Sequence, residues 1–423
     1  MASHMCCVVP PYLLDALCEC SDPELREMAA STLAFGQTIQ DERHEFSQGG
    51  FTDTATDHHD DDTPGPAQGI VPDYLLESIG GSGEDPELQK ADRAAADAEG
   101  LSEAGMVASQ SGFFREVYDM EHSAADTQLP GKPRRAEGDG PHSDPAVNEV
   151  YDNALKVLLF YQKYFNLTSV DNNNMKIVSS VHYGSRVTNA WWHHNQMKYG
   201  DGIPGKLGHY TNALDVIGHE ITHGVTQFHS QIKYNGESGA LNEHISDVFG
   251  IMVKQIADNT TADKADWLLG ETCFMPDIKG VGLRNMLHPG TAWTRAKVTV
   301  MEGDDVQPDH YSKIAGILKN DPDGVKRDHG GVHYFSGIPN RAFALSATRF
   351  GGFSYEKAGK IWWTAVTAKE GSNPPTYRIP STCTFAQFAD VTVEVAKELF
   401  PNSGADQVVR TAWNDVGVQV KAH

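Results

Sequence analysis

The sequence predicts an α+β fold with two lobes, of which the first is rich in strands and the second is mainly helical. Between Phe113 and Asp215, aromatic and β-branched residues alternate with turn-forming residues, a pattern that is typical of strands. After Asp215, apolar residues recur at helical spacing through most of the remaining chain. A chain of 423 residues is long enough for two or three domains, each with its own core.

Composition narrows the class of protein. Apolar residues make up 39% of the chain, yet they form no run long enough to cross a membrane. The net charge of −23 argues against nucleic acid as a partner, because phosphate contacts need a basic surface. The amino terminus, MASHMCCVVPPYLLDAL, lacks a basic start and an unbroken apolar run. We therefore expect a cytoplasmic protein, or one exported without a signal peptide, and we expect a monomer.

The amino-terminal part contains a repeat and an acidic segment. VVPPYLLDAL at 8–17 returns as IVPDYLLESI at 70–79, and DPEL follows each copy, which indicates a duplication. Each copy predicts a proline turn and a short amphipathic helix followed by a second helix. Two unrelated capped helices of common composition are the alternative. Residues 41–105 hold 17 acidic against 3 basic side chains and are rich in Gly and Pro, so we expect much of this stretch to be mobile.

The six cysteines do not form the pattern of a disulfide scaffold. Four lie between Cys6 and Cys20, and the rest of the chain holds only Cys273 and Cys383. This distribution suits a reducing compartment. The spacing of the first four fits no common zinc pattern well.

Individual elements follow from local patterns. Strands are predicted within the segments 113–121, 176–184 and 191–202. A helix is predicted over 145–165, because Asp144 and Pro145 form a typical helix start. Helical periodicity predicts further helices at 215–230, 237–257, 332–350, 354–369, 384–399 and 403–415. The helix at 215–230 begins at the seam between the two lobes, where clefts commonly form.

This helix carries a possible metal-binding motif, DVIGHEITHGVT at 215–226. His219 and His223 stand four residues apart, so their imidazoles lie on one helical face and can bind one metal ion. Glu220 can reach beside that ion without being a ligand. A helix that carries three polar residues by chance remains the alternative until a third ligand is found.

The third ligand is predicted in the next helix, within YNGESGALNEHISDVFG. Glu243 would complete a set of two histidines and one glutamate, which leaves the fourth position of a zinc ion open for water. Asp247 stands four residues further on the same face. Its carboxylate could accept the other N–H of a ligating histidine and so fix the tautomer.

These motifs together resemble those of the thermolysin family of zinc metalloendopeptidases. HExxH is followed after nineteen residues by the glutamate of an N-E-x-x-S-D block. Aminopeptidase-type relatives place their glutamate one residue earlier, where this chain has Asn242. The likeness runs from about Arg115 to His423 and includes TNAWW, GLRNM, DHYSK and DHGGVHYFSGI. It implies a two-lobed thermolysin-like fold with the active site in the cleft between the lobes.

The resemblance also implies roles for individual residues. His219, His223 and Glu243 would bind one catalytic Zn²⁺, with Asn242 and Asp247 supporting the ligands, and Glu220 would be the general base. His333, oriented by Asp328, and Tyr234 would stabilise the transition state. The substrate backbone would be held by Asn189, Ala190 and Arg284. The main specificity pocket would be lined by Val216, Leu269, Cys273 and Leu283, which implies cleavage before large hydrophobic residues.

The chain departs from the family at the calcium sites. Asp215, Asp266 and Glu271 match calcium-binding positions, but Lys254 and Leu268 replace two acids, and Val281 replaces an acid at a second site. A lysine ammonium among carboxylates can neutralise them as a bound cation would. We therefore expect that calcium is not required for stability.

The amino-terminal part resembles the short PPYLL-type prosegment of the protealysin branch of this family. This likeness implies a propeptide at 6–45 that inhibits its own enzyme, with Pro10, Pro11, Tyr12 and Leu13 as its anchor. An acidic insert would follow at 46–112, then the N-terminal catalytic lobe at 113–226 and the helical lobe at 227–423. Peptides or proteins would be the substrates. A catalytically silent zinc-stabilised binding protein and an aminopeptidase-type enzyme remain the alternatives.

Overall fold

The computed structural model describes residues 6–20, 23, 25–33, 112–203, 207–230, 232–274, 280–294, 304–367 and 379–421. The second copy of the repeat, at 70–79, lies outside the described residues, as do residues 34–45 of the predicted propeptide and the acidic insert up to residue 111.

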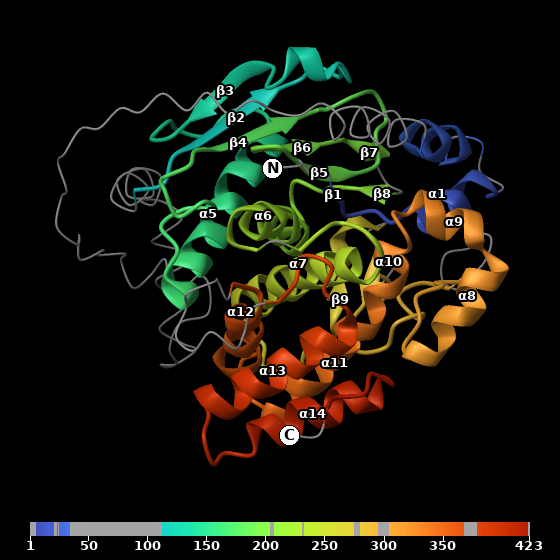
Figure 1. The fold of residues 1–423 in the computed structure, drawn as a ribbon. Coiled ribbons are helices and arrows are strands. Elements are labelled where there is room, and N and C mark those ends of the chain that lie inside the picture. Colours follow the sequence, from blue (N-terminus) through green and yellow to red (C-terminus); the bar gives the residue numbers. More distant parts are fainter. Residues whose placement is uncertain are drawn as a thin grey trace, which may run out of the picture.

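A six-stranded sheet forms the N-terminal lobe, with strand order β1-β5-β6-β4-β2-β3 (Figure 1). Its strands are β1 (Cys6–Cys7), β2 (Arg115–Asp119), β3 (Lys132–Ala136), β4 (Ile177–Val181), β5 (Ala190–His193) and β6 (Gln196–Tyr199). The strands β2, β4 and β6 run parallel, and β3, β5 and β1 pair antiparallel with their neighbours. The edge strand β1 comes from the amino-terminal segment, far from β5 in sequence.

The helix α5 (Pro145–Phe165) packs against this sheet and has the predicted bounds. It begins at Asp144, whose side chain accepts a hydrogen bond from the amide of Ala146. It ends at Asn166, which holds a left-handed backbone conformation with φ of 59°. The local start and stop signals therefore determine this helix.

The C-terminal part is mainly helical, as predicted. Its helices are α6 (Leu214–His229), α7 (Gly236–Ala257), α8 (Ile314–Asn320), α9 (Pro322–Arg327), α10 (Val332–Phe335), α11 (Gly337–Phe350), α12 (Lys360–Thr367), α13 (Phe385–Leu399) and α14 (Ala405–Asp415). Two short ribbons are formed by β7 (Gly202–Ile203) with β8 (Leu207–Gly208), and by β9 (Leu268–Leu269) with β10 (Arg284–Asn285). Figure 1 shows α6 and α7 in the centre, with the sheet on one side and α11 to α14 on the other.

Two predicted helices differ in the structure. The helix predicted at 332–350 is divided at Ser336 into α10 and α11. There the carbonyl of His333 accepts hydrogen bonds from the Gln307 amide, at 2.6 Å, and from the Ser336 hydroxyl, at 3.2 Å. These side chains take the place of the next helical amide, so the helix breaks. The segment predicted as a helix from residue 354 begins with a π-helical turn at Tyr355–Gly359 before α12.

The amino-terminal segment packs onto the catalytic part. Its helix α1 (Pro11–Cys18) buries Tyr12 and Leu13, and the Tyr12 ring lies 4.9 Å from that of Tyr334. Asp15 of α1 forms a 3.0 Å ion pair with Arg327 of α9. In the following helical stretch, at 25–33, the Thr32 hydroxyl accepts a hydrogen bond from an amide of the sheet lobe. The segment therefore contacts both lobes.

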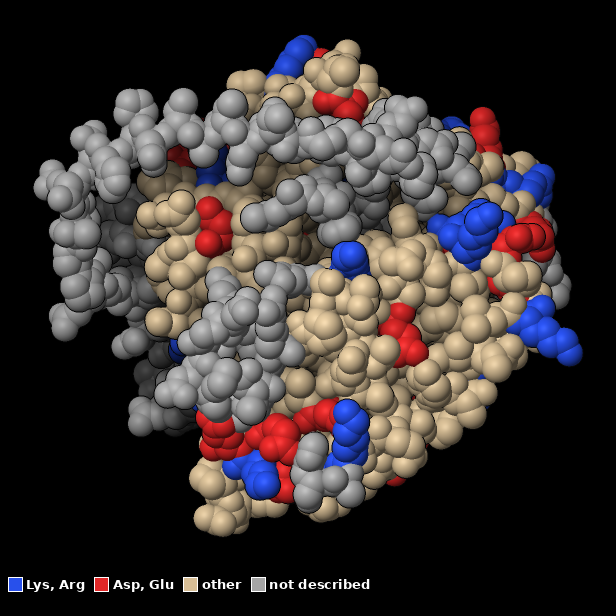
Figure 2. Space-filling model, in the orientation of Figure 1, with Lys and Arg blue, Asp and Glu red and all other residues tan. Residues whose placement is uncertain are grey.

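The visible surface carries a mixed charge. On the face shown in Figure 2, the described Lys and Arg side chains lie among Asp and Glu side chains. Within the described ranges, no helix is both long and apolar enough to cross a membrane.

Candidate metal centre and active site

The helices α6 and α7 approach closely where both carry glycine. A Cβ atom added at Gly218 would lie 3.0 Å from the Cα of Gly250, and one added at Gly250 would lie 3.0 Å from the backbone nitrogen of His219. Side chains larger than hydrogen would therefore push the helices apart. This close approach brings the next turns of both helices within reach of a common point.

His219 and His223 of α6 meet Glu243 of α7 at that point. The two Nε2 atoms lie 3.0 Å apart, and the carboxylate oxygens of Glu243 lie 3.5 Å from His219 Nε2 and 3.3 Å from His223 Nε2. All three side chains are buried, and one ligand atom from each lies within 4.8 Å of the others. The predicted ligand set is therefore brought together.

The hydrogen bonds made by Nδ1 of His219 and His223 determine that the lone pair of each ring is on Nε2. His219 Nδ1 lies 2.8 Å from a carboxylate oxygen of Asp247, and His223 Nδ1 lies 2.8 Å from the amide oxygen of Asn242. Both partners are acceptors, so each Nδ1 carries the hydrogen and each Nε2 presents a lone pair to the other. Burial lowers the pKa of His219 to about 4, although the hydrogen bond with Asp247 acts in the opposite direction. With this low pKa the His219 ring is neutral at pH 7.

Such an arrangement favours a bound cation. Two lone pairs 3.0 Å apart repel each other, and among the residues that the structure describes Glu243 Oε2 accepts no hydrogen bond. Burial opposes ionisation of Glu243, yet the facing rings of His333 and His223 hold its pKa well below the usual range. Two neutral imidazoles and one carboxylate are the donor set that zinc prefers in catalytic sites, so these residues fit a zinc ion.

Asp247 anchors a wider polar network. It accepts hydrogen bonds from Arg284 Nε and Nη2, both at 2.7 Å, and from the Asn340 amide at 2.8 Å. Burial opposes its ionisation, but Arg284 and His219 outweigh burial and lower the pKa of Asp247 to about 2. The carboxylate is therefore ionised, and it holds His219 in the tautomer that metal binding requires.

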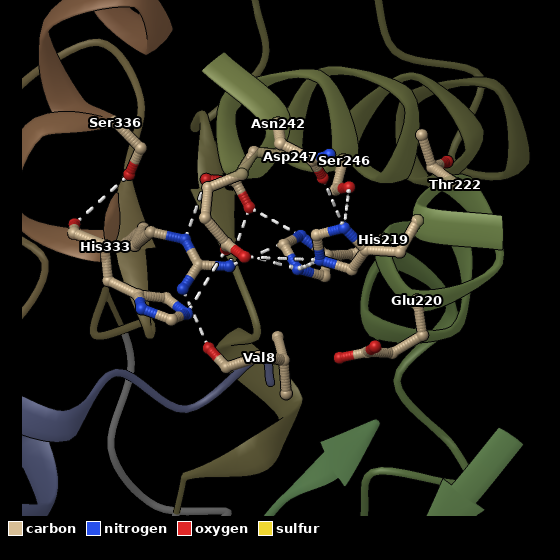
Figure 3. Close-up of polar contacts among 12 residues, drawn as sticks. Val8, His219, Glu220, Thr222, Asn242, Ser246, Asp247, His333 and Ser336 are labelled. Atoms are coloured by element: carbon tan, nitrogen blue, oxygen red, sulfur yellow. Dashed lines mark hydrogen bonds and ion pairs between the residues drawn. The ribbon is translucent and has the colours of Figure 1, made fainter. Parts of the chain in front are cut away.

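Glu220 lies beside the candidate ligands on α6. It is fully buried, and one of its carboxylate oxygens accepts a 2.7 Å hydrogen bond from the amide of Trp192 in β5. Figure 3 shows its carboxylate pointing from α6 toward Val8 of the amino-terminal segment. The hydrogen bond to β5 thus holds the Glu220 carboxylate beside the candidate metal ligands, between α6 and the sheet.

Two further predicted side chains converge on Glu243. The Tyr234 hydroxyl donates a hydrogen bond to Glu243 Oε1, and His333 Nε2 lies 3.3 Å from Glu243 Oε2. The other ring nitrogen of His333 lies 2.5 Å from Asp328 Oδ1, and the His333 amide donates to Asp328 Oδ2 at 2.8 Å. Asp328 therefore orients the His333 ring with Nε2 toward the candidate metal position. There the Tyr234 hydroxyl is one hydrogen-bond donor, and Nε2 of His333 is a second donor when the ring is an imidazolium.

Comparison with known proteins agrees with this geometry. Residues 102–227 match the family model of the thermolysin metallopeptidase catalytic domain, and residues 230–418 match that of its alpha-helical domain. An extracellular metalloprotease of Pectobacterium carotovorum subsp. carotovorum is 40% identical over 307 residues, which cover 73% of this chain and 82% of that protein. The chain belongs to the thermolysin family of metallopeptidases. Members of this family are zinc-dependent, and the chain is a metalloendopeptidase of this type.

Two further relatives place the chain within the thermolysin family. Protease PrtS of Photorhabdus sp. (strain Az29) is 38% identical over 309 residues, covering 73% of this chain and 77% of that protein. The structure of the precursor of protealysin from Serratia proteamaculans matches with a TM-score of 0.70 and 34% identity, covering 98% of this chain and 99% of that one. The chain is therefore protealysin-like within the family.

The amino-terminal segment occupies the groups expected to hold a substrate backbone in this family. Arg284 Nη1 donates to the carbonyl of Val8 at 2.7 Å, and the Val8 amide donates to the carbonyl of Ala190 at 3.4 Å. The Asn189 side chain accepts from the Val9 amide at 2.9 Å and donates to the Val9 carbonyl at 3.4 Å. Val8 and Val9 are fully buried. An extended stretch of the chain thus lies along β5, beside the metal centre.

The structure also describes the other positions that the family resemblance named. The four residues expected to line the specificity pocket are buried: Val216, Leu269, Cys273 and Leu283. At the calcium-type positions, the Lys254 ammonium lies 3.5 Å from Asp266 Oδ1 and donates to the Leu268 carbonyl at 2.9 Å. Burial opposes its charge, but Asp215, Asp266 and Glu271 raise the pKa of Lys254 above its usual value.

Sequence reasoning missed some supporting groups of this thermolysin-type site. Ser246 stands 2.9 Å from His223 Nδ1, and its position four residues after Asn242 on α7 was a helical signal for the same face. Asn340 and the Trp192 amide had no such signal, because each reaches the site from an element distant in sequence.

Proposed function

We propose that this chain is the zymogen of a zinc endopeptidase that hydrolyses internal peptide bonds, with His219, His223 and Glu243 as zinc ligands. The observation that carries the proposal is the convergence of these three buried side chains with Glu220 on one side and with Tyr234 and His333 on the other. A metal-stabilised binding protein has no need of a buried carboxylate and two donors around its ion.

The chain's own residues supply most of the chemistry. Bound zinc would act as a Lewis acid and would acidify a water molecule near neutral pH. Glu220 accepts the proton of the attacking water and passes it to the departing amine. His333 and Tyr234 donate hydrogen bonds to the oxygen on which negative charge develops. Arg284, Asn189 and Ala190 hold the substrate backbone so that the scissile carbonyl meets these groups.

Replacing Glu220 by Gln tests this function. The amide cannot accept the proton, so the variant should retain one zinc per catalytic site and lose peptidase activity by a factor of about 10² to 10⁴. Activity is measured on a peptide with a blocked amino terminus, which an aminopeptidase cannot use, and zinc by metal analysis. A fully active Glu220→Gln variant would refute the role of Glu220, and no hydrolysis of any blocked peptide by the zinc-loaded enzyme would refute the endopeptidase.

We further propose that the amino-terminal segment inhibits the enzyme by occupying its substrate site. Support comes from the hydrogen bonds of Val8 and Val9 with Arg284, Ala190 and Asn189, since a substrate would need the same groups. The likeness to the protealysin precursor is consistent with this role. The contacts of Tyr12 and Asp15 with Tyr334 and Arg327 would keep the segment in place.

A matched pair of variants tests self-inhibition. Val9→Pro removes the amide that donates to Asn189, whereas Val9→Ala keeps the amide and loses only two methyl groups. The intact precursor with Val9→Pro should hydrolyse a short blocked peptide faster than the precursor with Val9→Ala. Mass analysis shows that the chain is still intact during the measurement. Equal and low activity of both precursors would count against occupation of the substrate site as the cause of inhibition.

We also propose cleavage on the amino-terminal side of large hydrophobic residues. The apolar, buried side chains of Val216, Leu269 and Leu283 support this preference, as does the burial of Val8 at the site that holds a substrate backbone. Profiling with a library of blocked peptides gives the residue after each cleaved bond. A preference for charged residues at that position would contradict the proposal.

A further inference from the structure

Three polar side chains follow the carboxyl ends of three neighbouring parallel strands. His122 lies three residues after β2, His182 comes directly after β4, and Asp201 lies two residues after β6. The parallel pairs β2–β4 and β4–β6 bring these strand ends to one edge of the sheet (Figure 1). Side chains at the carboxyl ends of adjacent parallel strands commonly form ligand sites.

The three side chains meet at this edge. His122 Nδ1 lies 3.1 Å from Asp201 Oδ2, and His182 Nδ1 lies 2.7 Å from Asp201 Oδ1. One ligand atom from each residue lies within 4.8 Å of the other two. The backbone holds them there, because the His122 amide donates to the His182 carbonyl at 2.9 Å. The backbones of the two histidines are therefore held side by side just after β2 and β4.

The second nitrogen of His182 has a partner of its own. His182 Nε2 lies 2.7 Å from Asp144 Oδ2, while the other oxygen of Asp144 accepts the Ala146 amide and caps α5. A carboxylate that holds the outer nitrogen of a histidine is the usual support of a metal-ligating imidazole. The capped helix thus orients His182 with Nδ1 toward His122 and Asp201.

Access is compatible with a bound cation, which would replace the proton that Asp201 and Asp144 favour on His182 by raising its pKa to about 9. The exposed fractions of the side chains are 59% for His122, 32% for Asp201 and 21% for His182, so solvent can complete the coordination. The neighbouring cations are already paired, Arg134 with Asp119 at 2.8 Å and Lys132 with Glu121 at 2.6 Å.

We propose that His122, His182 and Asp201 bind a second divalent transition-metal ion of the zinc class, separate from the catalytic centre. Two imidazole nitrogens and one carboxylate favour zinc, nickel or copper over calcium and magnesium, which prefer oxygen ligands. Ligand atoms of a tetrahedral zinc ion with bonds of about 2.1 Å lie about 3.4 Å apart. The separations of 3.1 Å and 2.7 Å from Asp201 to the two histidines would therefore open by about 0.3 Å and about 0.7 Å when the ion binds. The ion would join three strand ends and stabilise the folded lobe.

Zinc binding by the full-length chain tests the site. The chain carries Glu220→Gln so that it stays intact, and it is dialysed against buffered zinc over a range of free concentrations before metal analysis. His122→Asn removes one ligand, and Asn tolerates the left-handed backbone that His122 adopts, with φ of 62°. His209→Asn is the matched control, because His209 is an exposed histidine with φ of 58° outside the cluster.

His122→Asn should lose one equivalent of zinc, or bind it at least tenfold more weakly, while His209→Asn keeps the full amount. Asp144→Asn preserves the helix cap but turns a donor toward His182, so it should weaken the same equivalent about 10- to 100-fold. These changes should not affect the zinc ion bound at the catalytic centre. In chains that keep Glu220, they should not affect peptidase activity either. Equal zinc binding by His122→Asn and His209→Asn would overturn the proposal and leave the cluster as an ion-pair network. An unchanged affinity of Asp144→Asn would overturn the positioning role of Asp144.

Discussion

Replacing Asp247 by Asn should weaken both zinc binding and folding, because this carboxylate has no donor of its own and faces only donors. It accepts hydrogen bonds from His219 Nδ1, Arg284 Nε, Arg284 Nη2 and Asn340 Nδ2, each at 2.7 to 2.8 Å. An asparagine replaces one oxygen by an NH₂ group. Whichever way the amide turns, a donor then meets either His219 and Arg284 or Arg284 and Asn340.

The magnitude follows from the two partners. Loss of the acceptor that fixes the His219 tautomer costs about 10- to 100-fold in zinc affinity, or about 1.4 to 2.7 kcal/mol. Arg284 and Asp247 are both fully buried, and removing one partner of such a pair costs about 3 to 5 kcal/mol of unfolding free energy. Because the total stability of a protein is about 5 to 15 kcal/mol, the second effect is large.

Two assays separate these effects. Competition with a chromophoric chelator gives the Kd for zinc, and urea unfolding of the metal-free protein gives the free energy of unfolding. Asp390→Asn is the control, because Asp390 pairs near the surface with the exposed Lys421, so both quantities should stay within about 0.5 kcal/mol of wild type. If Asp247→Asn matched this control in both assays, the reasoning about the network would be wrong.

Three further predictions concern other parts of the molecule. His333→Ala should lower kcat on a blocked peptide about 10²- to 10³-fold with little change in KM, and an unchanged kcat would remove His333 from transition-state stabilisation. Burial raises the pKa of Asp305 from 3.8 to about 6, so its protonated form stabilises the folded state at low pH, and this contribution is lost as the pH rises through 6. The unfolding free energy of wild type relative to Asp305→Asn should therefore fall by about 2 kcal/mol between pH 4.5 and pH 7, whereas a difference independent of pH would contradict the raised pKa. Lys254→Met should lower the unfolding free energy by about 3 kcal/mol, because among the described residues Lys254 is the cation that favours the ionised form of the buried Asp215. An unfolding free energy equal to that of wild type would contradict this role. A calcium-selective chelator should leave the melting temperature of wild type unchanged. A large fall in the melting temperature on adding the chelator would show that calcium is required for stability.

The local sequence determined much of the fold and the centre of the candidate site. The helix over 145–165 was predictable because its cap, its proline and its terminal asparagine act within a few residues. The spacing of His219 and His223 was equally informative, because 3.6 residues per turn place residues four apart on one face whatever the rest of the chain does. The helix break at Ser336 was not predictable, because its cause, Gln307, approaches from another segment.

The tertiary structure decided which distant groups meet. The pairing of β1 with β5 places Val8 and Val9 against Asn189 and Arg284, and no local pattern contains that register. The same holds for His122, His182 and Asp201, which come together because three parallel strands end at one edge of a sheet. Helical periodicity is a property of neighbouring residues, and it can be read directly from the sequence. Contacts of the amino-terminal segment with β5 and Arg284, and contacts between strand ends, depend on how the whole chain packs, so only the folded molecule reveals them.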